Sequence, residues 1–289
     1  MGGVSRRPAR GRKGANPGRR GGQRPGNRRG PADHRDGPPR RRPAPGLGGD
    51  QVEGRNAVRE LLAVGRRHVH EVMVATDMDD SPIVAEIVDI AYDRRIKVTE
   101  VSKRRLDAEA ISEAPQGVLA LAAPLKPVEI EDLLEGSGTP FLLVLDGITD
   151  PGNLGAILRT AEGAGVSGVV MPRHRAARVT PTVAKAAAGA IEHLRIAQVG
   201  GLPAALQLLG ERKVWRIGLH GPAKDRLFDL KVADEPVALV LGAEGKGVSR
   251  LVRERCDQLV SIPILGELES LNVAAAGALA LYEVVRARS

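Results

Sequence analysis

Residues 51–123 alternate between two apolar patterns. In three segments apolar side chains recur every three or four residues, which predicts helices, and in three others they form short runs, which predict strands. In chain order, these helices and strands are predicted at 54–64, 71–75, 82–92, 97–101, 103–111 and 117–122. The alternation predicts a small α/β/α domain.

Residues 140–289 carry more continuously apolar runs. Strands are predicted at 141–145, 168–171, 194–199, 214–219, 237–241 and 258–262. Helices are predicted at 154–163, 182–191, 202–209, 249–256 and 271–287. Near-continuous apolar strands that alternate with helices are typical of a parallel sheet covered on both faces, so we expect one α/β domain with a single core.

Two segments depart from this pattern. Prolines and the run Gly136-Ser137-Gly138 interrupt residues 124–139, which we interpret as a linker. Residues 271–287 are rich in alanine, and their apolar positions cover more than one stripe of the predicted helix. Such a helix needs cover beyond its own sheet, so a partner subunit is expected there, with burial wholly inside the chain as the alternative.

Charge is concentrated at the start of the chain. The net charge is +8, and residues 1–50 hold 14 Lys and Arg against 3 Asp, which leaves 29 Lys and Arg against 32 Asp and Glu in the rest. Rich in Gly and Pro, this segment has little to bury and is expected to be disordered. A basic arm predicts contact with RNA or DNA; a solubility tail or a targeting peptide is the alternative.

Composition also excludes several classes of protein. No run approaches the roughly 20 apolar residues of a membrane span. The single cysteine, Cys256, excludes an internal disulfide and a cysteine-based zinc site, and fits a cytoplasmic location. With 2 Phe, 2 Tyr and 1 Trp, the chain lacks a base-stacking platform. His68 and His70 lack a third ligand nearby, so we expect no metal and solvent-exposed rings.

The first of three unusual loops follows the predicted strand 141–145. Asp150-Pro151-Gly152 predicts a turn, and Asn153 predicts either the N-cap of the next helix or a ligand-binding group. Arg159 falls on about the second turn of that helix. Its alternative role is a surface ion pair with Glu162.

The other two loops follow strands 237–241 and 258–262. Gly242, Gly245 and Gly247 allow close backbone approach to a ligand and surround one carboxylate, Glu244. Ser270 and Asn272 precede the last helix, and capping that helix requires only one of them. Open α/β sheets bind ligands beyond the carboxyl ends of their strands, so we expect these loops to share a site.

Two phosphate-binding patterns do not apply. Residues 163–168 match G-x-G-x-x-G, but they run from a helix into a strand, the reverse of the order that a dinucleotide site requires. Gly245-Lys246 resembles the end of a P-loop, yet Gly247 stands where Ser or Thr is needed. A different α/β nucleotide enzyme is therefore disfavoured.

The three loops resemble the three motifs of the SpoU/TrmH family of RNA ribose 2′-O-methyltransferases, over residues 141–289. Residues 51–123 look like that family's small substrate-binding domain of ribosomal protein L30e type, which is typical of the 23S rRNA guanosine branch. One departure is Pro115, where members often have His before Gln-Gly. The motifs are Asn153-Leu-Gly-Ala-Ile-Leu-Arg159, Leu241-Gly-Ala-Glu-Gly-Lys-Gly247 and Ile262-Pro-Ile-Leu-Gly-Glu-Leu-Glu-Ser-Leu-Asn272.

This resemblance implies a C-terminal trefoil-knotted methyltransferase domain, residues 140–289, in an obligate homodimer. It also implies S-adenosylmethionine (AdoMet) as methyl donor, with Gly242, Ile262 and Leu271 at cofactor-contact positions. The residue matching Arg159 has the central catalytic role. Because a guanidinium resists deprotonation, our hypothesis is that Arg159 holds a phosphate and favours ionisation of the 2′-hydroxyl electrostatically. Ribose and cofactor would be oriented by Asn153, Glu244, Ser270 and Asn272.

The expected function is thus AdoMet-dependent methylation of a ribose 2′-hydroxyl in structured RNA, with a guanosine of 23S rRNA as the expected target and the basic tail adding affinity. Two alternatives stay open. One is a tRNA target for the same chemistry, and the other is a non-catalytic RNA-binding protein of ribosome assembly.

Overall fold

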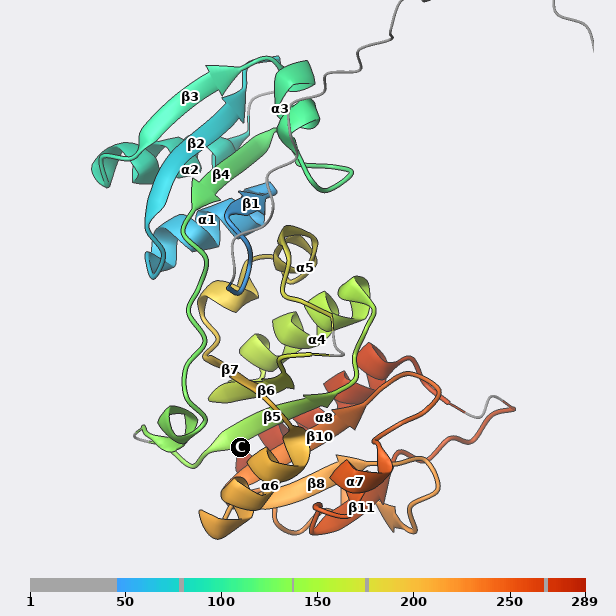
Figure 1. Cartoon of the computed structure of the whole chain (residues 1–289). Helices are drawn as coiled ribbons and strands as arrows, with labels where there is room; N and C mark the ends of the chain where they lie inside the picture. Colours follow the sequence, from blue (N-terminus) through green and yellow to red (C-terminus); the bar gives the residue numbers. More distant parts are fainter. Residues whose placement is uncertain (1–45, 78–80, 137, 175–176, 268–269) are drawn as a thin grey trace, which may run out of the picture. The chain divides into compact units, whose positions relative to one another are not determined.

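The computed structural model describes residues 46–77, 81–136, 138–174, 177–267 and 270–289 (Figure 1). The predicted disordered tail therefore lies almost wholly outside the described residues. Its last residues do not: Leu47 is buried, and its backbone pairs with Leu125. Leu47 lies within the predicted tail but belongs to the folded domain, because its apolar side chain completes the core of the larger domain.

The small domain is a four-stranded mixed sheet with three helices; the sequence predicted the three helices and three of the four strands. Its sheet order is β1-β4-β2-β3, in which only β2 and β3 are parallel. The three-residue β1 is too short to show a pattern in the sequence and was not predicted. The elements are β1 (Gln51–Glu53), α1 (Arg55–Val64), β2 (Val69–Ala75), α2 (Pro82–Asp93), β3 (Lys97–Val101), α3 (Lys103–Glu109) and β4 (Val118–Ala122).

The larger domain is built on a seven-stranded sheet in the order β7-β6-β5-β10-β8-β11-β9. Every paired strand is parallel, which confirms the predicted parallel sheet. The strands are β5 (Phe141–Asp146), β6 (Gly168–Pro172), β7 (Ile196–Val199), β8 (Trp215–Leu219), β9 (Asp225–Arg226), β10 (Val237–Gly242) and β11 (Gln258–Ser261). The helices are α4 (Pro151–Gly163), α5 (Pro181–Ala186), α6 (Leu202–Glu211), α7 (Arg250–Arg253) and α8 (Val273–Arg288).

Alternate residues of the central strands supply two cores on opposite faces of this sheet. Leu143 and Leu145 of β5 belong to the core that α4, α5 and α8 cover. Leu142 and Val144 belong to the other core, with α6 and α7. Figure 1 shows these two layers of helices. Burial on both faces explains why β5 and β10 are apolar throughout.

Three predicted elements differ from those observed. The helix predicted at 182–191 ends at Ala186, because Ala188 and Gly189 adopt positive φ angles of 51° and 88°. The helix predicted at 249–256 is reduced to the four residues of α7. The predicted linker contains a 3₁₀ helix, Glu131–Leu134, and its Leu133 is buried in a core. Local apolar spacing could not reveal that a proline-rich segment packs against the sheet.

A buried ion pair joins the small domain to the larger one. Arg67 Nη1 lies 3.1 Å from Glu192 Oε1, with both side chains almost wholly inaccessible. Arg67 also donates to the carbonyl oxygens of Ala123 and Gly49. Burial raises the pKa of Glu192, although the neighbouring arginine opposes this effect. Breaking such a pair is costly because it leaves an uncompensated buried charge, so the pair fixes the junction between the domains.

Candidate functional site

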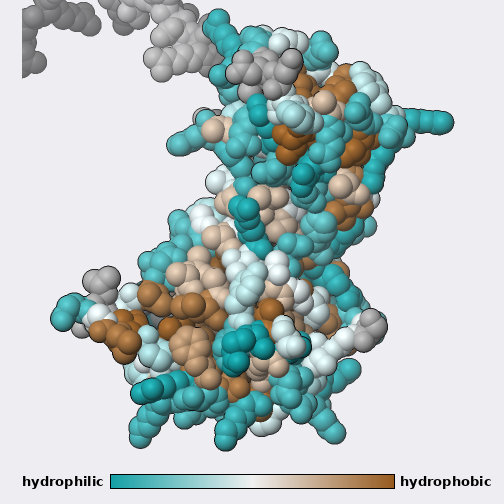
Figure 2. All heavy atoms as spheres, turned by 180° about the vertical axis from the view of Figure 1, so that it is seen from behind, coloured by the Kyte–Doolittle hydropathy of each residue, from teal (hydrophilic) through white to brown (hydrophobic). Residues whose placement is uncertain are grey.

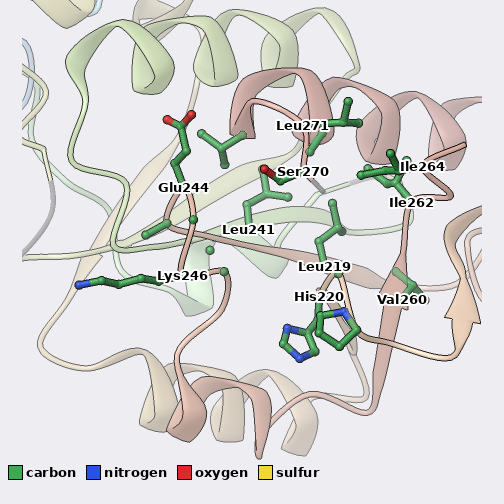
Figure 3. Close-up of a pocket in the computed structure, with 18 residues that line it drawn as sticks. Leu219, His220, Leu241, Glu244, Lys246, Val260, Ile262, Ile264, Ser270 and Leu271 are labelled. Carbon is green, nitrogen blue, oxygen red and sulfur yellow. The ribbon is translucent and has the colours of Figure 1, made fainter. Parts of the chain in front are cut away.

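A pocket of about 400 Å³ opens at the carboxyl edge of the seven-stranded sheet (Figure 3). It lies beyond β8, β10 and β11 and reaches the beginning of α8, where open parallel sheets hold their ligands. Its apolar wall is made by Leu219, Leu241, Val260, Ile262 and Leu271. This volume lies within the range of small-molecule sites. We call it the edge pocket.

Three side chains from the three loops form one hydrogen-bonded chain beside this pocket. Asn153 donates from Nδ2 to Glu244 Oε2 at 3.1 Å, and Asn272 donates from Nδ2 to Asn153 Oδ1 at 2.9 Å. Glu244 itself lines the pocket. The network therefore holds one carboxylate at the mouth of an apolar cavity and fixes which amide atoms donate.

Helix capping places two members of this network. Asp150, not Asn153, is the N-cap of α4: its Oδ1 accepts from the backbone N–H of Asn153 at 2.6 Å. The predicted cap at Asn153 is thus wrong, because Pro151 starts the helix earlier at the position proline favours. Asn272 is the N-cap of α8, accepting from Ala274 N at 2.9 Å. The Asn153 side chain is left available for Glu244.

The glycine loop after β10 doubles back tightly. A Cβ on Gly242 would lie 1.9 Å from the carbonyl carbon of Gly247, so no larger residue fits there. Gly245 and Gly247 adopt φ angles of 75° and 62°, which favour glycine. Ser249 donates its backbone N–H to Asp146 Oδ2 at 2.7 Å and so ties this loop to the one after β5; its side chain makes no capping bond.

The structure separates Arg159 from the other predicted site residues. Glu244, Ser270, Gly242, Ile262 and Leu271 line the edge pocket, and Asn153 and Asn272 bond to Glu244 or to each other. Arg159 instead lines a different cavity, together with Lys185. Six residues after Asn153 it lies about 240° further around α4, so the two side chains leave the helix in different directions. No ion pair with Glu162 is present in the described part of the chain.

His220 is a titratable pocket residue that the sequence analysis did not predict. His220 follows β8 and lines the edge pocket, and its Nε2 lies 2.9 Å from Arg253 Nη1. A guanidinium only donates, so Nε2 accepts and the imidazole proton resides on Nδ1. Burial lowers the pKa of His220, and the positive charge of Arg253 lowers it further. Its position at the end of a predicted strand was the only signal in the sequence.

Within the described ranges, no cluster of three or more His, Cys, Asp or Glu side chains has the arrangement of a metal site. His68 and His70 are exposed, as predicted, and their rings are 4.7 Å apart. No helix in the same ranges combines the length and apolarity that crossing a membrane requires. Fold and pocket together define an α/β protein with a ligand site beyond its central strands.

Comparison with known proteins identifies the family. Residues 140–282 match the SpoU rRNA Methylase family, and residues 51–128 match the domain described as RNA 2′-O ribose methyltransferase substrate binding. The chain is 39% identical to 23S rRNA (guanosine-2′-O-)-methyltransferase RlmB of Photobacterium profundum, over 84% of this chain and 99% of that one. The RlmB protein of Pectobacterium atrosepticum is 40% identical, over 82% and 98%.

Solved structures agree with this result. The SpoU methyltransferase AviRb from Streptomyces viridochromogenes, in complex with the cofactor AdoMet, superposes with a TM-score of 0.69 at 26% identity. The match covers 82% of this chain and 89% of AviRb. This chain therefore belongs to the SpoU family of RNA 2′-O-methyltransferases.

Proposed function

We propose that the protein transfers the methyl group of AdoMet to the ribose 2′-hydroxyl of a guanosine in 23S rRNA. The hydrogen-bonded chain Glu244–Asn153–Asn272 beside the edge pocket is the observation that carries this proposal. Membership in the SpoU family and the RlmB relatives support the reaction and the RNA class. A tRNA target and a non-catalytic role remain the alternatives that experiment must separate.

The residues of the edge pocket fit AdoMet. Aliphatic side chains, among them Leu241, Ile262 and Leu271, offer an apolar slot for adenine, and the turn at Gly242 brings backbone close to a ligand. Glu244 supplies a carboxylate where a sulfonium ligand requires a counter-charge. When bound, AdoMet supplies an electrophilic methyl group. The pocket itself binds, orients and excludes water around that group.

The network of polar side chains is proposed to position the ribose. Asn153 and Asn272 are each engaged at both amide atoms, which fixes their orientation before substrate arrives. Pre-organised groups of this kind accelerate a reaction by alignment rather than by proton transfer. Ser270, which lines the same pocket, is assigned to hold substrate or cofactor with its hydroxyl.

Arg159 is proposed to act at the edge pocket of a second subunit. Its guanidinium is exposed and lines another cavity of its own chain, so it does not complete the pocket beside Asn153. In a homodimer, a side chain displaced from its own site is free to enter that of the partner. There it would hold the phosphate next to the reacting ribose and stabilise developing negative charge.

The dimer interface is assigned to the outer face of α8. Leu279 and Tyr282 of this helix are 42% and 51% exposed, although the opposite face is packed against α4 and the sheet. Leu265 and Leu271, from the loop before α8, are also exposed. Figure 2 shows apolar side chains gathered on the surface of the larger domain. Exposed apolar area of this kind marks an interaction surface.

Other features implied by the family are part of the proposal. They are a trefoil knot near the C-terminus, a substrate-binding domain at 51–123, a linker at 124–139 that packs against the larger domain, a basic RNA-binding tail and a cytoplasmic location. The tight return of the glycine loop, which lines the same pocket as Ser270 and Leu271 before α8, supports a knotted pocket.

The test uses purified full-length protein, radiolabelled AdoMet and two RNA pools, 23S rRNA and tRNA from a strain that lacks this enzyme. We expect AdoMet binding by calorimetry and one new 2′-O-methylguanosine in 23S rRNA, located by mapping. Methylation of tRNA alone would correct the substrate. Failure to bind AdoMet would leave only the non-catalytic alternative.

A further inference from the structure

A second cavity, distinct from the edge pocket, lies between residues of the small domain and α4 and α5. Its volume is about 670 Å³. Polar side chains line both walls: Asn56, Ser112, Glu113 and Gln116 on one, and Thr182, Lys185 and Arg159 on the other. We call it the second cleft. Apart from Arg159, none of these polar groups has a ligand in the function proposed above.

The wall formed by the loop before β4 is rigidly built. Glu53 is 0% exposed and accepts from the backbone N–H groups of Ile111 and Ser112 at 2.6 and 2.9 Å. Ser112 Oγ donates to the same carboxylate and accepts from Lys185 Nζ, 3.2 Å away. A buried carboxylate thus holds the loop in place and joins it to α5.

Gln116 is held in a strained backbone conformation on this wall. Its φ is 58°, a backbone angle that residues other than glycine adopt rarely and at a cost in energy. Its Oε1 accepts from the backbone N–H of Arg55 at 3.1 Å, so its amide NH₂ group is turned away from that bond. In the described part of the chain this NH₂ group has no acceptor, and it is available to a ligand in the cleft.

The opposite wall carries positive charge. Arg159 is exposed and, within the described ranges, makes no ion pair; Lys185 is half-buried beside Ser112. The two cations lie on one wall because α4, which carries Arg159, packs closely against α5, which carries Lys185. A Cβ on Gly155 of α4 would lie only 2.4 Å from Ala186 Cβ of α5. Cations opposite amide and carboxylate groups match a nucleotide, with phosphate on one side and the hydrogen-bonding edge of a base on the other.

We propose that the second cleft binds one unpaired guanosine nucleotide of the RNA substrate. Lys185 contacts its phosphate. Gln116 donates to guanine O6, and Glu113 accepts from N1–H and the 2-amino group; Asn56 holds the ribose or the base edge. None of the described residues that line the cleft is aromatic, so the base is read by hydrogen bonds rather than by stacking. This inference rests on the proposed function and adds a base-reading element outside the methyl-donor pocket.

The test compares full-length wild type with Gln116→Glu. Glutamate keeps an oxygen for Arg55 N and keeps the shape, but replaces the NH₂ donor by an acceptor. The probes are four fluorescein-labelled RNA hairpins with UUXUU loops, where X is G, A, C or U. For wild type we expect binding to the G hairpin tighter by roughly tenfold. For Gln116→Glu we expect that preference to vanish, whereas Gln207→Glu on α6, a matched change of charge, should retain it.

Two further measurements keep the outcome decisive. Asn56→Ala, which adds no charge, should weaken binding of the G hairpin by roughly fivefold with an unchanged melting temperature. The ratio of wild-type to Gln116→Glu affinity for the G hairpin is measured at two salt concentrations. Repulsion between the new carboxylate and RNA is screened by salt, whereas loss of the hydrogen-bond donor is not. Retention of the G preference in Gln116→Glu would overturn the inference, as would its absence in wild type. Calorimetric AdoMet binding, measured in parallel, reports on the proposed function alone.

Discussion

Asn153 Nδ2 donates to Glu244 Oε2 across 3.1 Å, although the two residues are 91 positions apart in the chain. The bond joins the beginning of α4 to the glycine loop after β10. Residue 153 must carry a neutral amide, because its Nδ2 donates to Glu244 while its Oδ1 accepts from Asn272 Nδ2. The identity of this one side chain therefore organises all three loops.

Asn153→Asp should abolish most methyl transfer. The substitution places two carboxylates against each other and turns the donor to Glu244 into an acceptor, so we expect kcat to fall roughly 100-fold. Asn153→Ala removes the bond without the repulsion and should cost less, about tenfold. Single-turnover rates with saturating AdoMet measure this order. An aspartate variant that is as active as the alanine variant would contradict the role of Asn153.

Gly242→Ala should destroy the pocket by overpacking. Its Cβ would lie 1.9 Å from the carbonyl carbon of Gly247, a clash with backbone that side-chain rotation does not relieve. We expect a loss of at least about 3 kcal/mol of unfolding free energy and no measurable AdoMet binding. Gly266→Ala is the control, because a Cβ there meets nothing within 4 Å. Chemical denaturation and calorimetry on both variants compare these effects.

Subunits carrying Arg159→Ala and Glu244→Gln should complement each other. If Arg159 serves the partner's pocket, a purified heterodimer of the two variants contains one intact site and should have about half of the wild-type activity. If Arg159 serves its own chain, both sites are defective and the heterodimer should be as inactive as the two parent homodimers. Differently tagged subunits, isolated by tandem affinity purification, distinguish the two arrangements.

AdoMet affinity should fall at acidic pH because of His220. Burial and Arg253 lower the pKa of His220 below its ordinary value of 6.5, so the folded protein keeps this ring neutral somewhat below pH 6.5. As the pH falls through the lowered pKa, protonation sets a second cation beside Arg253 and near a sulfonium ligand. Binding should therefore be constant from about pH 8 to 6.5 and weaken below that range.

Removing the charge at Arg253 should shift the pH dependence of AdoMet binding to higher pH. Arg253→Leu eliminates one cause of the lowered pKa of His220, so the loss of affinity should begin at higher pH. The carboxylate of Glu244 and the ammonium of Lys246 line the same pocket and are unchanged in this comparison. His68→Gln, an exposed histidine in the small domain, is the control and should leave the profile as it is.

Deletion of residues 1–45 should change RNA affinity but not the methylated nucleotide. The basic segment contributes contacts to phosphates, each worth about −0.7 to −0.9 in the slope of log K against log salt. The slope should become less steep by several such increments. Phosphate contacts carry no base information, so mapping should find the same modified position. A Gly/Ser tail of equal length controls for chain length, and a new target nucleotide would refute this separation.

The local sequence determined the order and type of nearly all the elements. Continuous apolar runs such as 141–145 predict strands that are buried on both faces. The glycines between Gly242 and Gly247 predict a turn whose backbone can approach a ligand closely. Spacing alone failed where a distant contact decided the outcome. The linker with Leu133 packs on a core, and the helix after Pro181 ends where Ala188 and Gly189 turn left-handed.

The candidate site shows the same division. Loop position and the family resemblance predicted Asn153, Glu244, Ser270 and Asn272 as site residues, and the structure brings Asn153, Glu244 and Asn272 into one hydrogen-bonded chain. Only the tertiary structure showed that Asp150 caps α4, that His220 enters the pocket and that Arg159 lines a different cavity. Which side of a helix faces a pocket depends on how that helix packs against distant strands, and this packing is a property of the whole core rather than of any one segment.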